Sequence, residues 1–400
     1  MQFPRAPRRR RAAVGVVIAV LSVSCAFRSA SGDLRLAGPS DWTQLPTPTP
    51  LQAVDRAYAA LGTDLVRGLS LLFGGVGANG TSLNDTWVND ADVAGHWASY
   101  PFPSGRSPPA LRNASLVYDS ALGEFVLFGG ATEGGAVYGG TWTFGNFSWA
   151  NLSGIGRTFP PAVAHPWMGY DALDRAVVLW DLQPGGASTW EYLTNGWVPV
   201  VTAGPPTDFL ARAVVTDTTG GAVLLFGSVP SNGTVPPLSE TWSFAETHWT
   251  LVDTSTVLPL TPSAFATFDP RVDGVVYLTS NPTSTWEYAN GSWGNVTTGP
   301  LAPRDRFGAQ FYFDRGEGAP LLFGGLAPGS HNVLAEVWGW RIPPPALDVT
   351  VGVAPLPWST YAEVAAAFAV PFVAMLLLRR RPPRKLPTTV PRPVRSSAGI

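Results

Sequence analysis

A repeat built on tryptophan constrains what this 400-residue chain can fold into more than any other feature. Four segments place an aromatic residue two positions after a Trp and a second Trp seven positions after the first, as residues 142–149 do. Each segment reads as a strand, a tight turn and a second strand, and Asn195-Gly196 suits the turn because both residue types tolerate positive φ. Most of the Trp residues fit this repeat, and we interpret them as the core of its units. The repeat positions hold Trp42, Trp87, Trp97, Trp142, Trp149, Trp190, Trp197, Trp242, Trp249, Trp286, Trp293 and Trp338.

A second hairpin precedes each Trp segment, and its turn begins with an Asp. The six turn residues are Asp64, Asp119, Asp171, Asp217, Asp269 and Asp314. Nine residues after each Asp, a large apolar residue ends a hydrophobic run, which indicates a strand buried on both faces. Each repeat thus supplies four strands, the content of one propeller blade. No second Trp follows Trp338 at the usual distance, so we expect residues 41–45 to complete its sheet and close a ring of six blades.

Three hydrophobic runs end in Leu-Phe-Gly-Gly, at residues 72–75, 127–130 and 322–325. Together with the Trp-x-aromatic strand and the later Trp, this pattern resembles the kelch repeats of the galactose oxidase propeller over residues 40–343. The resemblance implies an all-β, six-bladed kelch-type β-propeller closed by an N-terminal strand. Three repeats depart from the pattern by placing Trp180-Asp181, Gly227-Ser228 and Leu278-Thr279 where Gly-Gly is expected.

The two ends of the chain carry targeting patterns. Residues 1–30 combine a basic start with an apolar stretch, which predicts a signal peptide or an N-terminal anchor and leaves cleavage, lipidation and retention open. Residues 358–378 are apolar enough to form a single transmembrane helix. The Pro-rich segment 344–357 reads as a stalk. The Arg-rich tail 379–400 predicts a cytoplasmic C-terminus, and thus a cell-membrane protein whose propeller is extracellular.

Charge and Asn sequons agree with an extracellular propeller. All 28 acidic residues but only 13 of the 26 basic residues lie between Asp33 and Glu363. This segment therefore has a net charge of −15, which argues against nucleic-acid binding. Asn-x-Ser/Thr sequons are more frequent than chance would give, so we expect a glycoprotein. The candidate glycosylation sites are Asn79, Asn84, Asn113, Asn146, Asn151, Asn232, Asn290 and Asn295.

Residues typical of catalysis are scarce. Cys25 is the only Cys and lies in the predicted signal, which argues against a copper-radical centre like that of galactose oxidase. The four His show no metal-ligand spacing, so we expect no metal and no cofactor, and we name no catalytic residue. The recurring Asp residues read as turn formers. Asp181 breaks the repeat and is a candidate functional residue, while Trp167, Trp180 and Trp340 lie outside the Trp repeat.

Four long loops, each joining the second and third strands of a blade, offer the best surface for recognition. They span residues 76–83, 131–139, 229–239 and 326–335. Our first hypothesis is a membrane-anchored binding or scaffold module for an unknown glycan or protein at the cell surface. A carbohydrate-active enzyme that uses acidic residues near the propeller channel is an alternative, and a structural component of the cell envelope is another.

Overall fold

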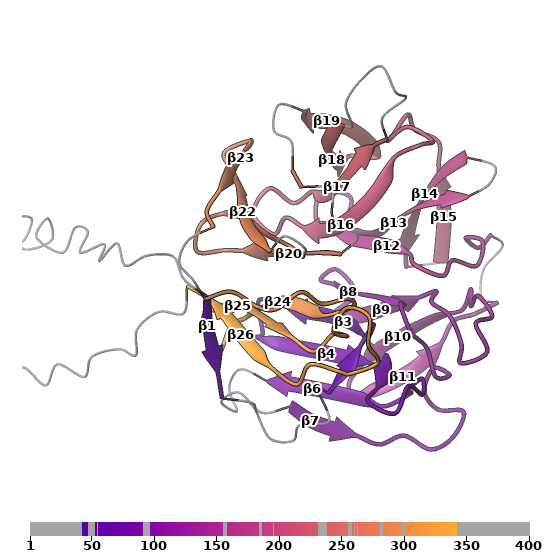
Figure 1. Cartoon of the computed structure of the whole chain (residues 1–400). Helices are drawn as coiled ribbons and strands as arrows, with labels where there is room; N and C mark the ends of the chain where they lie inside the picture. The colour runs from indigo at the N-terminus through magenta and orange to yellow at the C-terminus, as the bar shows by residue number, and fades with distance from the viewer. Residues whose placement is uncertain are drawn as a thin grey trace, which may run out of the picture. The chain divides into compact units, whose positions relative to one another are not determined.

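The computed structural model describes residues 42–341, except 47–52, 54, 91–96, 155–157, 184–185, 195, 231–237, 255–257, 260, 262, 281–282 and 298–300. The described residues form six four-stranded antiparallel sheets and one two-stranded pair (Figure 1). The prediction of an all-β, six-bladed propeller is therefore confirmed. The first strand of each sheet is called inner and the fourth outer, and the sheets are blades 1 to 6 in chain order of their inner strands.

The strands have the following bounds. Blade 1 holds β3 (Ala60–Asp64), β4 (Leu69–Phe73), β6 (Thr86–Asp90) and β7 (Trp97–Tyr100). Blade 2 holds β8 (Ser115–Asp119), β9 (Glu124–Phe128), β10 (Thr141–Gly145) and β11 (Ser148–Asn151). Blade 3 holds β12 (Trp167–Asp171), β13 (Ala176–Gln183), β14 (Gly186–Leu193) and β15 (Gly196–Val200).

The second half of the ring repeats this order. Blade 4 holds β16 (Leu210–Thr216), β17 (Val223–Val229), β18 (Leu238–Ala245) and β19 (His248–Asp253). Blade 5 holds β20 (Ala264–Asp269), β21 (Gly274–Thr279), β22 (Ser284–Ala289) and β23 (Ser292–Asn295). Blade 6 holds β24 (Gln310–Asp314), β25 (Ala319–Phe323), β26 (Val337–Trp340) and β1 (Trp42–Leu45), while β2 (Arg56–Ala57) pairs with β5 (Val76–Gly77).

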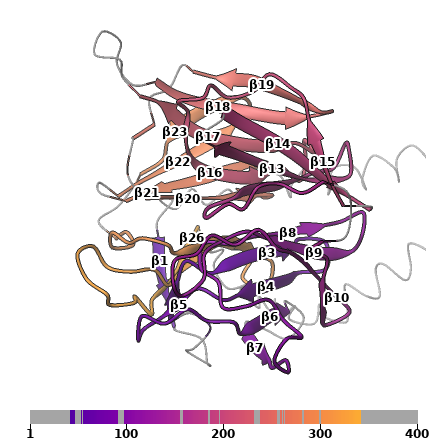
Figure 2. The same cartoon turned by 90° about the vertical axis from the view of Figure 1, so that its right-hand side faces the viewer.

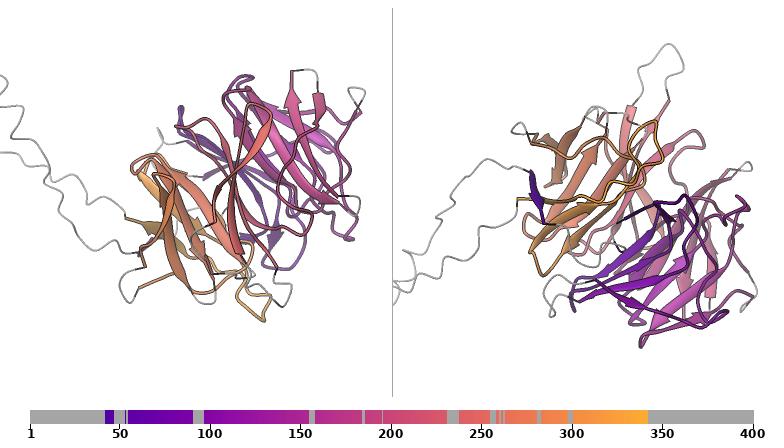
Figure 3. Two further views of the ribbon diagram at one scale, coloured as in Figure 1. Left: turned by 90° about the horizontal axis from the view of Figure 1, so that it is seen from above. Right: turned by 60° about the horizontal axis from the view of Figure 1, so that its bottom comes forward.

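The ring closes through the N-terminal strand. β1 runs antiparallel to β26, with Trp42 opposite Trp340 and Gln44 opposite Trp338, as the sequence predicted (Figure 3). Neighbouring inner strands contact one another around the whole ring, including β24 with β3. Blades 1 and 4 consequently lie on opposite sides (Figure 2). Because β1 supplies the outer strand of blade 6, every blade has four strands.

The turn Asp residues act as the sequence indicated. Each of the six accepts a hydrogen bond from a backbone N–H two or three residues later, as Asp64 does from Val66 at 3.0 Å and Arg67 at 3.1 Å. Five of them are buried at the ends of the inner strands. A side-chain oxygen that caps its own turn fixes the inner hairpin of each blade.

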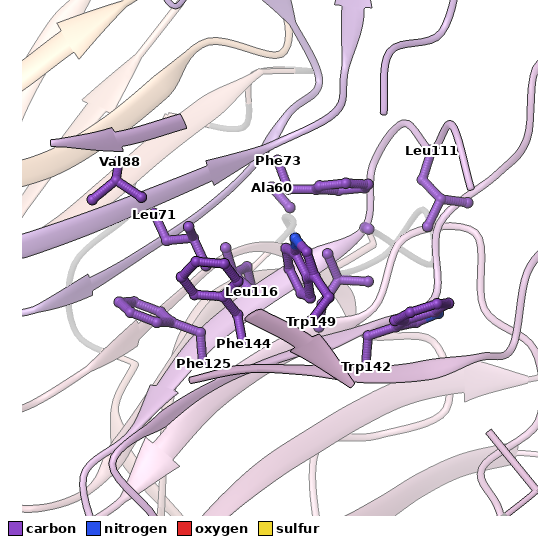
Figure 4. Close-up of a cluster of buried hydrophobic side chains, with 12 residues drawn as sticks. Ala60, Leu71, Phe73, Val88, Leu111, Leu116, Phe125, Trp142, Phe144 and Trp149 are labelled. Atoms are coloured by element: carbon purple, nitrogen blue, oxygen red, sulfur yellow. The ribbon is translucent and has the colours of Figure 1, made fainter. Parts of the chain in front are cut away.

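Indole N–H groups join one blade to the next. In five blades the outer-strand Trp donates to the hydroxyl of a Thr on the third strand of the preceding blade, at 2.8–2.9 Å, and that Thr comes directly before the third-strand Trp. The pairs are Trp149 with Thr86, Trp197 with Thr141, Trp249 with Thr189, Trp293 with Thr241, and Trp42 with Thr285. In the close-up of blades 1 and 2, Phe73 also packs edge-on against Trp149, with ring centroids 5.3 Å apart (Figure 4). In the repeated Thr-Trp pair, the Trp packs in the blade and the Thr hydroxyl accepts a hydrogen bond from the next blade.

Replacing Thr141 with valine is expected to lower the free energy of unfolding by about 1–3 kcal/mol, because the buried Trp197 indole N–H loses its acceptor. Urea unfolding of the full chain measures the change. Thr141→Ser keeps a hydroxyl and is the matched control, so it should lose less. Equal stability of the two variants would show that this hydrogen bond does not hold the blades together.

The glycine pairs have a steric reason. Gly74 and Gly75 adopt φ of 65° and 92°, and a Cβ on Gly74 would lie 2.6 Å from the Leu111 carbonyl oxygen. In blades 3 and 4 the second and third strands instead continue in regular register, with Asp181 opposite Ser188 and Ser228 opposite Ser239. The departures from Gly-Gly therefore mark longer hairpins, in which residues with side chains are accommodated.

Two of the Trp residues outside the sequence repeat belong to the core. Trp340 is fully buried, lies opposite Trp42, and occupies the place that Phe144 holds in blade 2. Trp180 is buried against Phe209, with ring centroids 5.7 Å apart. Both side chains are almost completely buried, which leaves the partly buried Trp167 as the candidate of the three.

The predicted terminal segments, 1–30, 344–357, 358–378 and 379–400, lie outside the described residues. No helix within the described ranges is long and apolar enough to cross a membrane.

Candidate ligand site at the channel mouth

The six inner strands all begin on the same face of the propeller, where they surround a cavity of about 460 Å³. This opening, here called the mouth, is lined by the residue six positions before each turn Asp. Those residues are Tyr58, Asn113, His165, Ala211, Ser263 and Gly308. Because the repeat sets one backbone position per blade at the mouth, side chains far apart in the sequence meet there.

Hydrogen bonds between neighbouring blades hold the backbone of the mouth. The Tyr58 N–H donates to the Gly308 carbonyl at 2.7 Å, and the Asn113 N–H donates to the Tyr58 carbonyl at 2.8 Å. Tyr58 and Asn113 have φ of 58° and 57°, a region that residues with a Cβ seldom adopt. Gly308 is required here, because a Cβ would lie 2.4 Å from the Tyr58 ring. Such fixed, unusual backbone is typical of ligand sites.

Trp167 supplies an aromatic surface. It begins the inner strand β12 and is only partly buried. It lines the mouth and also a side cavity of about 430 Å³, whose other walls come from blades 3 and 4. His165 and Arg212 likewise line both cavities, so the two spaces share one wall.

Arg212 reaches these cavities from a β-bulge. Its strand β16 shifts register against β17 between Ala211 and Ala213, whereas the ladders of the other five inner strands are regular. The residue left out of the ladder is Arg212, and bulges of this kind often redirect a side chain at a functional site. The Nε atom of Arg212 is buried and has no hydrogen-bond partner.

The electrostatics of the mouth are set by burial and by arginine. Burial raises the pKa of the Tyr58 hydroxyl, and the charge of Arg112 opposes this only in part. Burial lowers the pKa of His165, and Arg112 lowers it further. Tyr58 and His165 are therefore both neutral at pH 7 and can each donate and accept hydrogen bonds.

Asp181 lies beside this site. It is 7% exposed, pairs across the ladder with Ser188, and lines the side cavity with His165 and Arg212. It is the only acidic residue among the described residues that line either cavity. The part of the chain that the structure describes also holds no group of three or more His, Cys, Asp or Glu that could bind a metal. The mouth thus offers aromatic, amide and cationic groups rather than a pair of carboxylates.

The sequons are distributed over the surface. Asn79, Asn84, Asn146, Asn151, Asn290 and Asn295 are exposed, and Asn232 lies outside the described residues with most of the loop 229–239. Asn113 differs, because it is partly buried and lines the mouth. An amide at this place is suited to contact a ligand.

The opposite end of the channel holds a second cavity, whose lining is more apolar than that of the mouth. A cavity of about 340 Å³ lies between the inner strands there, with Met168, Phe268 and Phe313 among its walls. Its two acidic residues, Asp64 and Asp217, are the ones that cap their own turns. Among the described residues, amide, imidazole and guanidinium side chains line the mouth but not this second cavity.

Sequence reasoning found Asp181 and Trp167 but missed Tyr58, Asn113 as a mouth residue, and Arg212. The signal that could have found them is the turn Asp itself. Five residues before each turn Asp the chain places Ala59, Ala114, Pro166, Arg212, Ala264 and Ala309. One arginine among five small or apolar residues marks blade 4 as different.

These features define a six-bladed β-propeller with a candidate ligand site at the mouth of its channel. No protein-family model matches the sequence, and no curated protein matches it either.

Solved structures resemble the fold. YjhT is similar to this chain at 13% identity, with a TM-score of 0.50, over 72% of this chain and 95% of YjhT. A protein named as a candidate gluconolactonase matches at 10% identity, with a TM-score of 0.45, over 76% of this chain and 92% of its own. Likeness at such low identity shows the propeller fold alone.

Proposed function

We propose that this chain is a membrane-anchored, extracellular propeller of the kelch type that binds glycans at its channel mouth. The observation that carries the proposal is the position of Trp167, an aromatic surface at the start of an inner strand, where it lines both cavities. Sugar rings combine an apolar C–H face with hydroxyl groups. Concave sites with aromatic walls and a few fixed polar groups bind molecules of that kind.

The polar groups of the mouth suit hydroxyl recognition. Asn113 and Gln310 present amides, and Tyr58 and His165 are neutral groups that can both donate and accept. Each can hydrogen-bond a sugar hydroxyl without the cost of desolvating a charge. The observed lining supports binding more than hydrolysis, because acid-based glycoside cleavage uses two carboxylates and the two cavities share only Asp181.

The chain termini of the propeller are compatible with a membrane anchor. β1 begins and β26 ends side by side, at the end of blade 6 opposite the mouth. The part of the chain that the structure describes therefore begins and ends away from the mouth. We propose that the apolar segment 358–378 anchors the protein and that the exposed sequons carry glycans on the outside of the cell.

Trp167→Ala is expected to weaken glycan binding about tenfold or more, because a stacked aromatic ring contributes about 1 kcal/mol beyond its buried area. The measurement is binding of the detergent-solubilised full chain to a glycan array, followed by titration with the best ligand. Phe147→Ala is the matched control, since Phe147 is an exposed aromatic in a hairpin at the other end of blade 2.

Two results would contradict the proposal. One is a wild-type protein that binds no glycan of a broad array. The other is a glycan whose affinity falls equally in Trp167→Ala and Phe147→Ala, which would place its binding away from the mouth.

A further inference from the structure

The charge of the mouth is opposite in sign to that of the propeller around it. Acidic residues outnumber basic ones by 28 to 13 between Asp33 and Glu363. At the mouth the balance is reversed, because Arg212 lines both cavities and Arg112 acts on the pKa of Tyr58 and of His165. A local reversal of charge in a concave site raises the concentration of ligands with the opposite sign.

Arg212, which lines the mouth, and Arg112, whose charge acts on the mouth residues Tyr58 and His165, differ from the two buried arginines of the fold. Arg56 and Arg306 are each 1% exposed, and each is joined to a carboxylate, Asp85 and Glu336 respectively. The side chains of Arg112 and Arg212 make no hydrogen bond or ion pair with another residue in the described ranges. Arg112 does act on the pKa of Glu133, but Glu133 is fully exposed and bonds to Ser82.

A buried donor without an acceptor costs free energy, so the Nε of Arg212 would gain from a partner outside the chain. The fork of guanidinium N–H donors matches the two oxygens of a carboxylate. Arg212 is suited to such a partner, because it lines both cavities and its buried Nε lacks an acceptor.

We infer that the ligand of the mouth carries an anionic group, and that Arg212 binds this group while Arg112 adds attraction at longer range. The ligand class is an acidic sugar, whose ring lies against Trp167 and whose carboxylate meets Arg212. A sulfated sugar presents the same oxyanion chemistry, and the experiment separates the two. That the ligand is a sugar rests on the proposed function, whereas the anionic group is inferred from Arg212 independently of it.

The geometry also assigns a limit to the site. Asp181 shares the side cavity with Arg212 and repels a second anionic group there. A ligand with one anionic group and an otherwise neutral ring therefore fits better than a polyanion. The same Asp181 separates this site from a general phosphate or nucleic-acid surface, which would use many cations.

The test uses calorimetric titration of the detergent-solubilised full chain with glucuronate, glucose, glucose 6-sulfate and inorganic sulfate. Glucuronate or glucose 6-sulfate should bind more tightly than glucose, and the affinity should fall as salt rises. Arg212→Gln should lower the affinity for the anionic sugars at least thirtyfold and change the affinity for glucose by less than threefold. Arg212→Lys should lower the affinity for the anionic sugars by less than Arg212→Gln does. Arg106→Gln is the control, because Arg106 is exposed and lies outside both cavities.

The outcomes are distinguishable. Sulfate binding that is lost in Arg212→Gln, without binding of any sugar, would support the anion site and contradict the glycan proposal. Glucose binding as tight as glucuronate binding would overturn the inference and leave the glycan proposal standing. An Arg212→Gln variant that binds anionic sugars as the wild type does, or a wild type that binds none of the four compounds, would also overturn it.

Discussion

Replacing Arg56 with methionine is expected to lower the free energy of unfolding by about 3 kcal/mol, the largest loss of stability from any single change considered. The Arg56 side chain is 1% exposed and donates two hydrogen bonds to Asp85, each 2.8 Å long. It donates a third, also 2.8 Å, to the Gly74 carbonyl. Methionine fills a similar volume but leaves the carboxylate and the carbonyl without their donor.

The Asp85 carboxylate reports on this pair. Burial alone would raise its pKa, but the hydrogen bonds and charge of Arg56, with a further hydrogen bond from Trp87, outweigh burial and lower it. A carboxyl whose pKa is lower in the folded state stabilises the fold above its unfolded pKa. That contribution is lost as the pH falls through the folded pKa. The difference in unfolding free energy between the wild type and Arg56→Met should therefore be smaller at low pH than at pH 7.

Urea unfolding of the full chain at pH 7 measures the effect. Arg106→Met is the matched control and should change the stability by less than about 0.5 kcal/mol, because Arg106 is exposed. A double variant, Arg56→Met with Asp85→Leu, should recover part of the loss, since it removes the unpaired charge. An Arg56→Met protein as stable as Arg106→Met would refute the role of the pair.

The blade count could be read from the sequence because one physical requirement recurs in every blade. Each inner hairpin needs a carboxylate to cap its turn, and each outer strand needs a large aromatic residue between blades. The residues that meet these requirements recur at nearly fixed spacing. Six blades could therefore be counted from Asp64 and its equivalents and from the repeated Trp residues. The closure by β1 followed from the same count, because blade 6 lacked one outer strand.

The partners of these residues could not be read in the same way. Asp85 and Glu336 each come directly before a third strand, but the arginines that they pair with lie 29 and 30 residues away along the chain. Likewise, the Thr of each Thr-Trp pair serves a Trp on the next blade, at 52–63 residues along the chain in four of the five pairs. Such separations are set by how blades pack, not by local periodicity.

The candidate site was only partly visible for a related reason. A ligand site needs residues that differ from blade to blade, so a search for repeats passes over them. Asp181 was noticed because it breaks a strong pattern at Gly-Gly. Arg212 stands at a position where the other blades place Ala or Pro, but that position carries no motif and becomes evident only when the inner strands are aligned.

Replacing Glu191 with glutamine is expected to stabilise the protein at pH 8 and to leave it nearly unchanged at pH 4. Glu191 lies on β14, is 7% exposed, and has a buried Oε1 with no hydrogen-bond partner. Burial raises its pKa to about 7, helped by the negative charges of Asp174 and Asp171. Those two residues each have a buried Oδ2 without a partner as well, so the cluster lacks a cation.

The sign of the pH dependence follows from the direction of the shift. The pKa of Glu191 is near 4.5 when the chain is unfolded and about 7 when it is folded, so the folded state holds a proton more tightly. This proton contributes stability fully below pH 4.5, and the contribution is lost as the pH rises through 7. At about 1.4 kcal/mol per pKa unit, the shift from 4.5 to about 7 corresponds to a loss of about 3–4 kcal/mol. Glutamine keeps the shape of the neutral acid at every pH and should avoid that loss.

Blade 5 provides the matched control. Glu287 occupies the position of Glu191 in its own blade, but it pairs with Arg341, and its neighbour Asp269 pairs with Arg271. Glu287→Gln therefore removes one partner of an ion pair and should destabilise the protein at pH 8, opposite in sign to Glu191→Gln. Urea unfolding of the full chain and both variants at pH 4, 6 and 8 measures the difference. If Glu191→Gln were no more stable than the wild type at pH 8, the carboxyl would have to be charged and compensated in the folded protein, and the cluster of Glu191, Asp171 and Asp174 in blade 3 would have to bind a cation.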